Sequence, residues 1–489
     1  MRMGRALAVA HTTKSMHNFR LRAIPPWWSD AKFGIFVHWT LASVPAFAPV
    51  GTAFKDLLQS GDPSAYSSTP YVEWYQNSLR FPNSPVSAFH REKYGELPYE
   101  SFQKDFEAAI EKWDAREWVQ SFVQSGAEYV VLVAKHADGY CLWPSSVTNP
   151  RRPAWFSKRD VVGELASAVR QAGLKFGIYY CGGMDWTFND QPVGQMSDVF
   201  AAIPQDDYPQ YADDQIRELI NLYRPDILWN DVAWPGRASS LQKLFEYYYA
   251  QVPNGVVNDR WLPWSPVLGA CRCKVVAWLV NTIARSSMKR AGGLIPPRPP
   301  HYDYRTPEYV VFPTVQKEPW ECVRGMDESF AFNAYSREEN FIEPEALSWL
   351  VTDVCAKGGN VMLNVGPRGV DGSIPEVQQE RLKSLGEWLV PLAPALKGTR
   401  PWLSQGTKIA EGDRVRYTCN ALGVVYAFVR GGGPQVKLSA MATTGTSVSV
   451  LHGATLPWRE MDTGIEVDLP SERGPTTVLV LTNVEAFSN

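Results

Sequence analysis

The sequence lacks the features that mark several specialised protein classes. It has no Asn-X-Ser/Thr site for N-glycosylation and no apolar run of the ~18–20 residues that a membrane span requires. Acidic and basic residues nearly cancel, and the resulting net charge of −3 gives no general electrostatic case for binding nucleic acid or a membrane surface. We therefore expect neither nucleic acid nor a membrane among the partners.

Cysteine and glycine patterns exclude further classes. The seven cysteines are scattered, with no CxxC or Cys/His ligand spacing, which argues against a structural zinc site and against a disulfide framework. No Gly-rich phosphate loop follows any predicted strand, so nucleotide-binding folds are disfavoured.

The amino terminus is basic and carries only a short apolar patch, residues 6–10, closed by His11 and Lys14. This patch is shorter than the ~7–15 residues of a secretory apolar region. We expect residues 1–25 to be a tail that is not cleaved, and the location to be cytoplasmic, with a degenerate signal peptide as the alternative.

What the chain does contain is a regular alternation of apolar strands and amphipathic helical stretches over residues 26–395. This alternation predicts parallel strands with crossover helices, and hence an α/β (β/α)-type TIM-like barrel or a doubly wound sheet. After Pro401 the runs become short, β-branched and separated by Gly and Pro, which predicts a small antiparallel β-sandwich domain over residues 400–489.

Polar residues follow the predicted barrel strands at their carboxyl ends. His38, His136, Tyr179, Asp231 and Arg260 each lie at or just after the end of such a strand. Because a (β/α) barrel places its catalytic groups at this rim, we expect these residues to share one pocket. For Asp231 alone, an alternative is a helix N-cap that follows a strand.

Residues 262–300 fit neither pattern. The segment contains basic residues, no acidic residue and a proline-rich end. Long insertions of this kind inside a compact domain are uncommon. We consider three alternatives: an active-site lid, a partner-binding insert, or foreign sequence such as translated non-coding DNA.

Eight motifs, in order, resemble those of the α-L-fucosidases of glycoside hydrolase family 29. The resemblance extends from about residue 26 to about residue 395, and the trailing β domain also fits. The motifs are AKFGIFVHW (31–39), SVPA (43–46), EWY (73–75), AKHADGY (134–140), WNDVAWP (229–235), NDRW (258–261), DYRTPEY (303–309) and KGGN (357–360).

The resemblance implies hydrolysis of terminal α-L-fucose with retention of configuration, without a metal or cofactor. It assigns Asp231 as the nucleophile and Glu308 as the general acid/base. Such a reaction needs one ionised carboxylate to attack the anomeric carbon and one protonated carboxyl to donate to the leaving oxygen, ~5–5.5 Å apart. Glu321 and Glu73 are rival acids.

The resemblance also assigns residues that contact the sugar. The residues that match by position are His38, Glu73, Trp74, His136, Tyr179 and Arg260, and we add Trp229 and Phe330 as further apolar residues of the pocket. His, Glu and Arg would hydrogen-bond the hydroxyls, and Trp74, Trp229 and Phe330 would present apolar surface to the 6-methyl group. Tyr179 and Tyr180 point to opposite faces of their strand, so only one should line the pocket, and we choose Tyr179.

Three departures leave alternatives open. Ala137 stands where the family commonly has a second histidine, and Thr40 stands where the family usually has Gly. The 262–300 insert separates Arg260 from Glu308. The main prediction is an exo-α-L-fucosidase acting on a fucosylated oligosaccharide or glycoconjugate. The alternatives are a non-catalytic fucose-binding protein and a barrel glycosidase for another galactose-configured sugar. Oligomeric state stays open, a homo-oligomer being one alternative.

Overall fold

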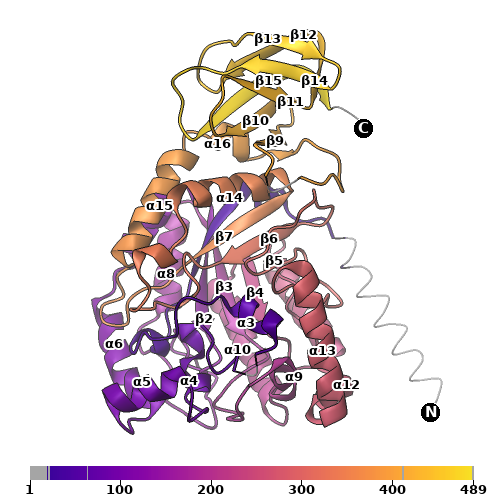
Figure 1. The fold of residues 1–489 in the computed structure, drawn as a ribbon. Helices are drawn as coiled ribbons and strands as arrows, with labels where there is room; N and C mark the ends of the chain where they lie inside the picture. The colour runs from indigo at the N-terminus through magenta and orange to yellow at the C-terminus, as the bar shows by residue number, and fades with distance from the viewer. Residues whose placement is uncertain (1–18, 20–21, 63, 410–411, 487–489) are drawn as a thin grey trace, which may run out of the picture.

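The computed structural model describes residue 19 and residues 22–62, 64–409 and 412–486 (Figure 1). The predicted tail, residues 1–25, falls largely outside them. Within it, Phe19 packs against Phe245, and the Arg22 guanidinium forms an ion pair of 2.8 Å with Asp303.

The larger domain is built on a curled sheet of seven parallel strands in the order β5-β4-β3-β2-β1-β7-β6. These strands are buried along nearly their whole length, as expected when helices cover the outside and side chains fill the inside. Their bounds are β1 Phe33–Val37, β2 Tyr129–Lys135, β3 Lys175–Cys181, β4 Ile227–Asp231, β5 Val256–Val257, β6 Trp320–Arg324 and β7 Gly359–Val365.

The gap between edge strands β5 and β6 is bridged by the irregular segment 303–308. The Asp303 amide donates to the Val257 carbonyl on one side, and Arg305 and Glu308 form parallel bridges with β6 on the other. This segment completes the circuit of the barrel, so the predicted acid/base Glu308 lies on the stretch of chain that closes it.

Helices pack on the outside of the sheet through apolar faces. In α8, for example, the buried face comprises Val161, Val162, Leu165, Ala166 and Val169, and the Asp160 side chain caps the helix by accepting from the Gly163 amide. The longer covering helices are α6 Phe102–Lys112, α7 Ala115–Gln124, α8 Val161–Gln171, α10 Tyr208–Tyr223, α11 Ala238–Gln251, α14 Pro344–Ala356 and α15 Glu376–Leu389.

Shorter helices lie before the barrel and in its loops. They are α2 Pro26–Ala31, α3 Phe54–Ser60, α4 Tyr75–Ser78, α5 Pro85–Tyr94, α9 Met196–Ala201, α12 Pro266–Gly269 and α16 Ala393–Leu396, with 3-10 turns η1 Leu41–Ser43, η2 Val72–Trp74, η3 Tyr99–Ser101, η4 Ala270–Arg272 and η5 Glu338–Asn340.

The insert forms a helix rather than an irregular loop. Helix α13, Lys274–Ala291, runs along the side of the barrel next to α9 and packs against α3 and α9 (Figure 1). Asn281 ties it to α9, because its Oδ1 accepts from the Ser197 amide at 2.8 Å. Its outer face exposes Val275, Trp278 and Ile283. The three alternatives for this segment, an active-site lid, a partner-binding insert and foreign sequence, stay predictions.

In the part of the chain that the structure describes, no single helix is long and apolar enough to cross a membrane. Residues 266–272 and 274–291 meet the length and composition requirement only when taken together, across a bend of 105°.

The C-terminal domain consists of two antiparallel sheets, of five strands (β12-β15-β10-β9-β8) and three strands (β11-β14-β13), facing a common apolar core. The domain lies at one end of the barrel, beside α14 and α16 (Figure 1). The strands are β8 Arg400–Pro401, β9 Val415–Cys419, β10 Val425–Arg430, β11 Gln435–Leu438, β12 Ala440–Val450, β13 Trp458–Met461, β14 Gly464–Asp468 and β15 Thr476–Ala486. The predicted fold class, a (β/α)-type barrel followed by a small antiparallel β domain, is confirmed.

Candidate active site

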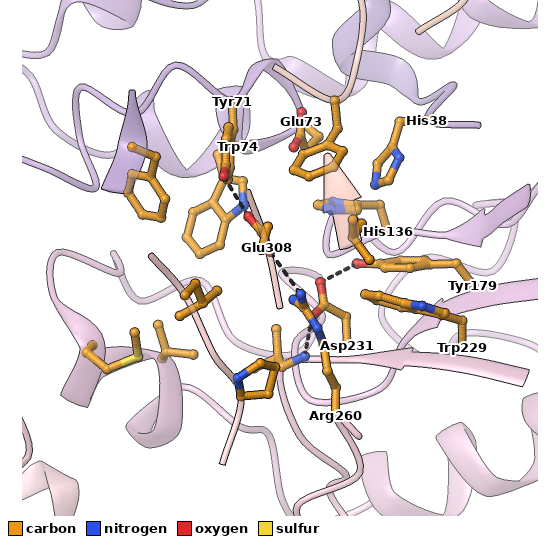
Figure 2. A pocket seen from close by; sticks show the side chains of 18 of the residues that line it. His38, Tyr71, Glu73, Trp74, His136, Tyr179, Trp229, Asp231, Arg260 and Glu308 are labelled. Atoms are coloured by element: carbon orange, nitrogen blue, oxygen red, sulfur yellow. Dashed lines mark hydrogen bonds and ion pairs between the residues drawn. The ribbon is translucent and has the colours of Figure 1, made fainter. Parts of the chain in front are cut away.

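All ten predicted site residues line one pocket (Figure 2). The residues are His38, Glu73, Trp74, His136, Tyr179, Trp229, Asp231, Arg260, Glu308 and Phe330. They come from β3, β4, η2 and the segments that follow β1, β2, β5 and β6. Parallel strands bring their carboxyl ends to one rim, so residues far apart in the sequence meet there.

The two predicted catalytic carboxylates share one guanidinium. Arg260 Nη1 lies 2.9 Å from Asp231 Oδ1, and Arg260 Nη2 lies 3.0 Å from Glu308 Oε2 (Figure 2). Burial alone would lower the pKa of Arg260, but the two carboxylates raise it above its ordinary value. The arginine therefore holds a permanent positive charge between the two acids.

Asp231 is surrounded by hydrogen-bond donors. Besides Arg260, the Tyr179 hydroxyl donates to Oδ2 at 2.9 Å, and the Val232 amide donates to Oδ1 at 2.8 Å. Val232 has a φ of 69°, a conformation that β-branched residues rarely adopt. Tyr309, directly after Glu308, likewise has a φ of 53°. Strained backbone thus follows both carboxylates, as is common at functional sites.

Of the two tyrosines on β3, Tyr179 faces the pocket. Its ring stacks on Trp229 at 5.3 Å between centroids, and on its other neighbour His136 at 5.8 Å. Tyr180 points the opposite way, and its hydroxyl donates to Gln215 of α10 at 2.9 Å. The alternation of side chains along a strand decides this assignment.

The two histidines are neutral. Burial lowers the pKa of His136 to about 4 and holds the pKa of His38 well below its usual range. His38 Nδ1 lies 2.6 Å from Asn364 Oδ1, and the Asn364 amide group donates to the Phe330 carbonyl. Because an amide oxygen only accepts, Nδ1 carries the proton and Nε2 is the acceptor of the ring.

Glu73 is a buried carboxyl whose pKa is raised by burial to about 8. Its Oε2 accepts from the Ala331 amide at 3.0 Å. At neutral pH it is therefore mainly protonated and can donate, while His38 can accept. A pair of neutral groups with opposite hydrogen-bonding roles suits the hydroxyls of an uncharged sugar.

The rival acid Glu321 lies on β6 outside the pocket lining. Its Oε1 accepts from the Tyr129 hydroxyl at 2.6 Å, and burial raises its pKa to about 8. Ala137 is also buried in the core, beside Trp186, whose amide donates to its carbonyl at 2.7 Å. Neither residue contributes to the walls of the pocket.

Sequence reasoning missed one residue next to Glu308. The Tyr71 hydroxyl donates to Glu308 Oε1 at 2.6 Å (Figure 2). Tyr71 precedes η2, which carries Glu73 and Trp74, and its only signal in the sequence is this proximity. The contact between the insert and Glu308 has no signal in the sequence either. The backbone amide of Glu308 donates to the carbonyl of Leu294, at the end of the insert, at 2.9 Å.

Among the residues that the structure describes, no group of three or more His, Cys, Asp or Glu side chains could hold a metal ion. The chemistry that the arrangement supports is that of paired carboxylates: one with three donors around it, the other held by a tyrosine and an arginine.

Comparisons with known proteins agree with this geometry. A sequence model of the family described as alpha-L-fucosidase matches residues 2–391. Curated relatives include an alpha-L-fucosidase of Dictyostelium discoideum, 29% identical with 92% of this chain and 87% of that protein covered. The tissue alpha-L-fucosidase of Homo sapiens is 28% identical, with 92% and 86% covered.

Solved structures agree as well. The Thermotoga maritima alpha-fucosidase in complex with fucose is 35% identical, with a TM-score of 0.77 and 95% of this chain and 98% of that chain covered. An alpha-L-fucosynthase from the same organism, in complex with α-L-Fuc-(1-2)-β-L-Fuc-N3, has a TM-score of 0.80 at 35% identity, with 96% and 98% covered. With the matched family model, the fold and the paired carboxylates of the pocket, the chain belongs to the alpha-L-fucosidase family of glycoside hydrolases.

Proposed function

We propose that the protein is a retaining exo-α-L-fucosidase that releases terminal α-L-fucose from oligosaccharides or glycoconjugates through a covalent glycosyl-enzyme intermediate. The observation that carries the proposal is the shared guanidinium: Arg260 contacts Asp231 at 2.9 Å and Glu308 at 3.0 Å. Two carboxylates that bind the two Nη atoms of one arginine lie near enough to act on one glycosidic bond, as the nucleophile and the acid/base of a retaining pair must do.

In the first step, an oxygen of Asp231 attacks the anomeric carbon while protonated Glu308 gives its proton to the glycosidic oxygen, whose bond to that carbon breaks. In the second step, Glu308 takes a proton from water, the water oxygen attacks the same carbon, and the Asp231 carboxylate leaves. In the free site the Tyr71 hydroxyl donates to Oε1 of Glu308 and Arg260 donates to Oε2, and these contacts fix the orientation of the carboxyl group for both proton transfers.

The sugar half of the pocket supports fucose as the substrate. His38 and Glu73 offer an acceptor and a donor to hydroxyls, while Trp74, Trp229 and Phe330 offer apolar surface for a methyl group. A hydroxymethyl group in the same position would lose its hydrogen bonds to water, so a galactoside should be a poor substrate.

The proposal is tested with 4-nitrophenyl α-L-fucoside, beside 4-nitrophenyl β-D-galactoside, for the wild type and Asp231→Gly. We expect hydrolysis of the fucoside only, and a loss of about 10³-fold or more in kcat in the variant. Azide should restore cleavage by Asp231→Gly and give a β-fucosyl azide, because a small anion can enter the vacated space on the nucleophile's side. Fucose binding without turnover would instead identify a binding protein, and preferred cleavage of the galactoside would identify a different glycosidase.

A further inference from the structure

The pocket has a second half that the sugar chemistry does not use. Its walls come from α3, from α9 and from the end of the insert, and the side chains that these elements contribute are apolar: Phe54, Leu58, Val199, Phe200, Leu294 and Pro296 among them. Most polar side chains of the pocket come from the ends of the barrel strands, among them His38, His136, Asp231 and Arg260 (Figure 2).

The apolar half lies on the side of Glu308, where a leaving group must be. A smaller cavity adjoins the main pocket, and Phe54, Leu58, Tyr71, Leu294 and Glu308 line both. Leu294 is fixed beside the acid/base by backbone pairing, since the Glu308 amide donates to its carbonyl at 2.9 Å. The group that Glu308 protonates therefore leaves into a space bounded by Phe54, Leu58 and Leu294.

These walls offer few hydrogen bonds to a leaving group. Pro296 and Pro297 have no N–H, and the carbonyls of Leu294 and Pro296 already accept from Glu308 and from the Arg305 guanidinium. The hydroxyl of Tyr66 is directed at the Met196 sulfur, 3.8 Å away. A sugar in this space would bury hydroxyls without hydrogen-bond partners, which costs free energy. An alkyl or aryl group has no such hydrogen bonds to lose, and its burial removes apolar surface from water.

The insert helps to hold this half together. Asn281 of α13 binds the Ser197 amide at 2.8 Å and so fixes α9, and the Gln59 side chain of α3 donates to the Met288 carbonyl at 3.4 Å. Helix α13 thus supports both helices that contribute apolar walls.

We propose that the leaving-group side of this pocket binds an apolar aglycone, an alkyl chain or an aromatic ring, and that Phe54, Leu58 and Leu294 determine this specificity. The inference rests on the proposed fucosidase activity and adds the class of leaving group. Beyond the apolar side chains the smaller cavity reaches Lys55 and Glu328, so the preference extends only over the first few carbons.

The test is kcat/KM for a series of n-alkyl α-L-fucosides from methyl to hexyl, with a fucosyl-α-1,2-galactoside as the sugar-linked comparison. Simple alkyl alcohols differ little as leaving groups, so the series reports binding of the chain rather than its chemistry. We expect a rise of about threefold to fourfold for each methylene that leaves water, and at least tenfold from methyl to hexyl. The hexyl fucoside should also exceed the fucosyl-galactoside.

Leu58→Asn should reduce the hexyl-to-methyl ratio at least fivefold. The matched control is Leu279→Asn, the same change on the outer face of α13, where the side chain is 50% exposed. It should keep the ratio within twofold of the wild type. The wild-type series tests the inference by itself if Leu58→Asn does not fold.

The failures are distinguishable. A series that is hydrolysed with no dependence on chain length, or faster cleavage of the fucosyl-galactoside, would overturn this inference and leave the fucosidase activity standing. No hydrolysis of any fucoside, the 4-nitrophenyl fucoside included, would overturn the proposed function and the inference with it.

Discussion

Replacing Glu73 by Gln should make the protein more stable than the wild type at alkaline pH. Burial raises the pKa of Glu73 from the ordinary value of 4.5 to about 8. In this interval the folded protein keeps a proton that the unfolded chain has released, so each rise in pH favours unfolding. The stability that the folded protein gains by keeping this proton is fully present below pH 4.5 and is lost as the pH rises toward 8.

The magnitude follows from the size of the shift. One pH unit within the interval is worth about 1.4 kcal/mol, and ionisation of the folded form removes part of the effect near its pKa. From about pH 5.5 to about pH 8 the wild type should therefore lose about 3 kcal/mol relative to Glu73→Gln. Glutamine keeps an acceptor for the Ala331 amide and copies the donor of the protonated acid, but it does not titrate.

The assay is urea-induced unfolding of both proteins at the two pH values, followed by the fluorescence of the 19 tryptophans. Glu321, whose pKa burial also raises to about 8, is present in both proteins and cancels in the difference. Glu92→Gln, a change of an exposed residue of α5, controls for the loss of one carboxylate. If the wild type and Glu73→Gln lose stability in parallel over this range, Glu73 is already ionised at low pH and the argument from burial is wrong.

Two further predictions concern positioning. Tyr71→Phe removes the 2.6 Å hydrogen bond to Glu308 and should lower kcat by about tenfold or more with little change in KM. The control Tyr302→Phe, outside the pocket, should change neither kcat nor KM. Asn281→Ala leaves the Ser197 amide of α9 without its partner, and should speed limited proteolysis within residues 262–300 about fivefold or more. Thr282→Ala, whose hydroxyl donates to the Trp278 carbonyl of the same helix, should not.

Each of these results has a contrary outcome. A rise in KM with unchanged kcat for Tyr71→Phe would mean that the tyrosine contacts the sugar rather than orienting Glu308. Equal proteolysis of Asn281→Ala and Thr282→Ala would mean that packing, and not this hydrogen bond, holds α13 against α9.

The sequence by itself determined which polar residues would meet. His38, His136, Tyr179 and Asp231 each occur at the end of an apolar strand, and parallel strands in a barrel bring these ends to one rim whatever the loops do. Strand periodicity likewise decided between Tyr179 and Tyr180. These features depend on neighbouring residues in the sequence, so they can be predicted without knowing the contacts between distant segments.

Only the tertiary structure decided how the site is enclosed and how its charges are arranged. The contacts of Arg260 with both carboxylates, and of Tyr71 with Glu308, join segments separated by up to 237 residues and have no local pattern. Segment 303–308 closes the barrel through bonds to both neighbouring strands although it is not itself a regular strand. The insert, which resembles neither strand nor barrel helix in its composition, forms helix α13, and the contacts of this helix with α3 and α9 join segments that are distant in the sequence.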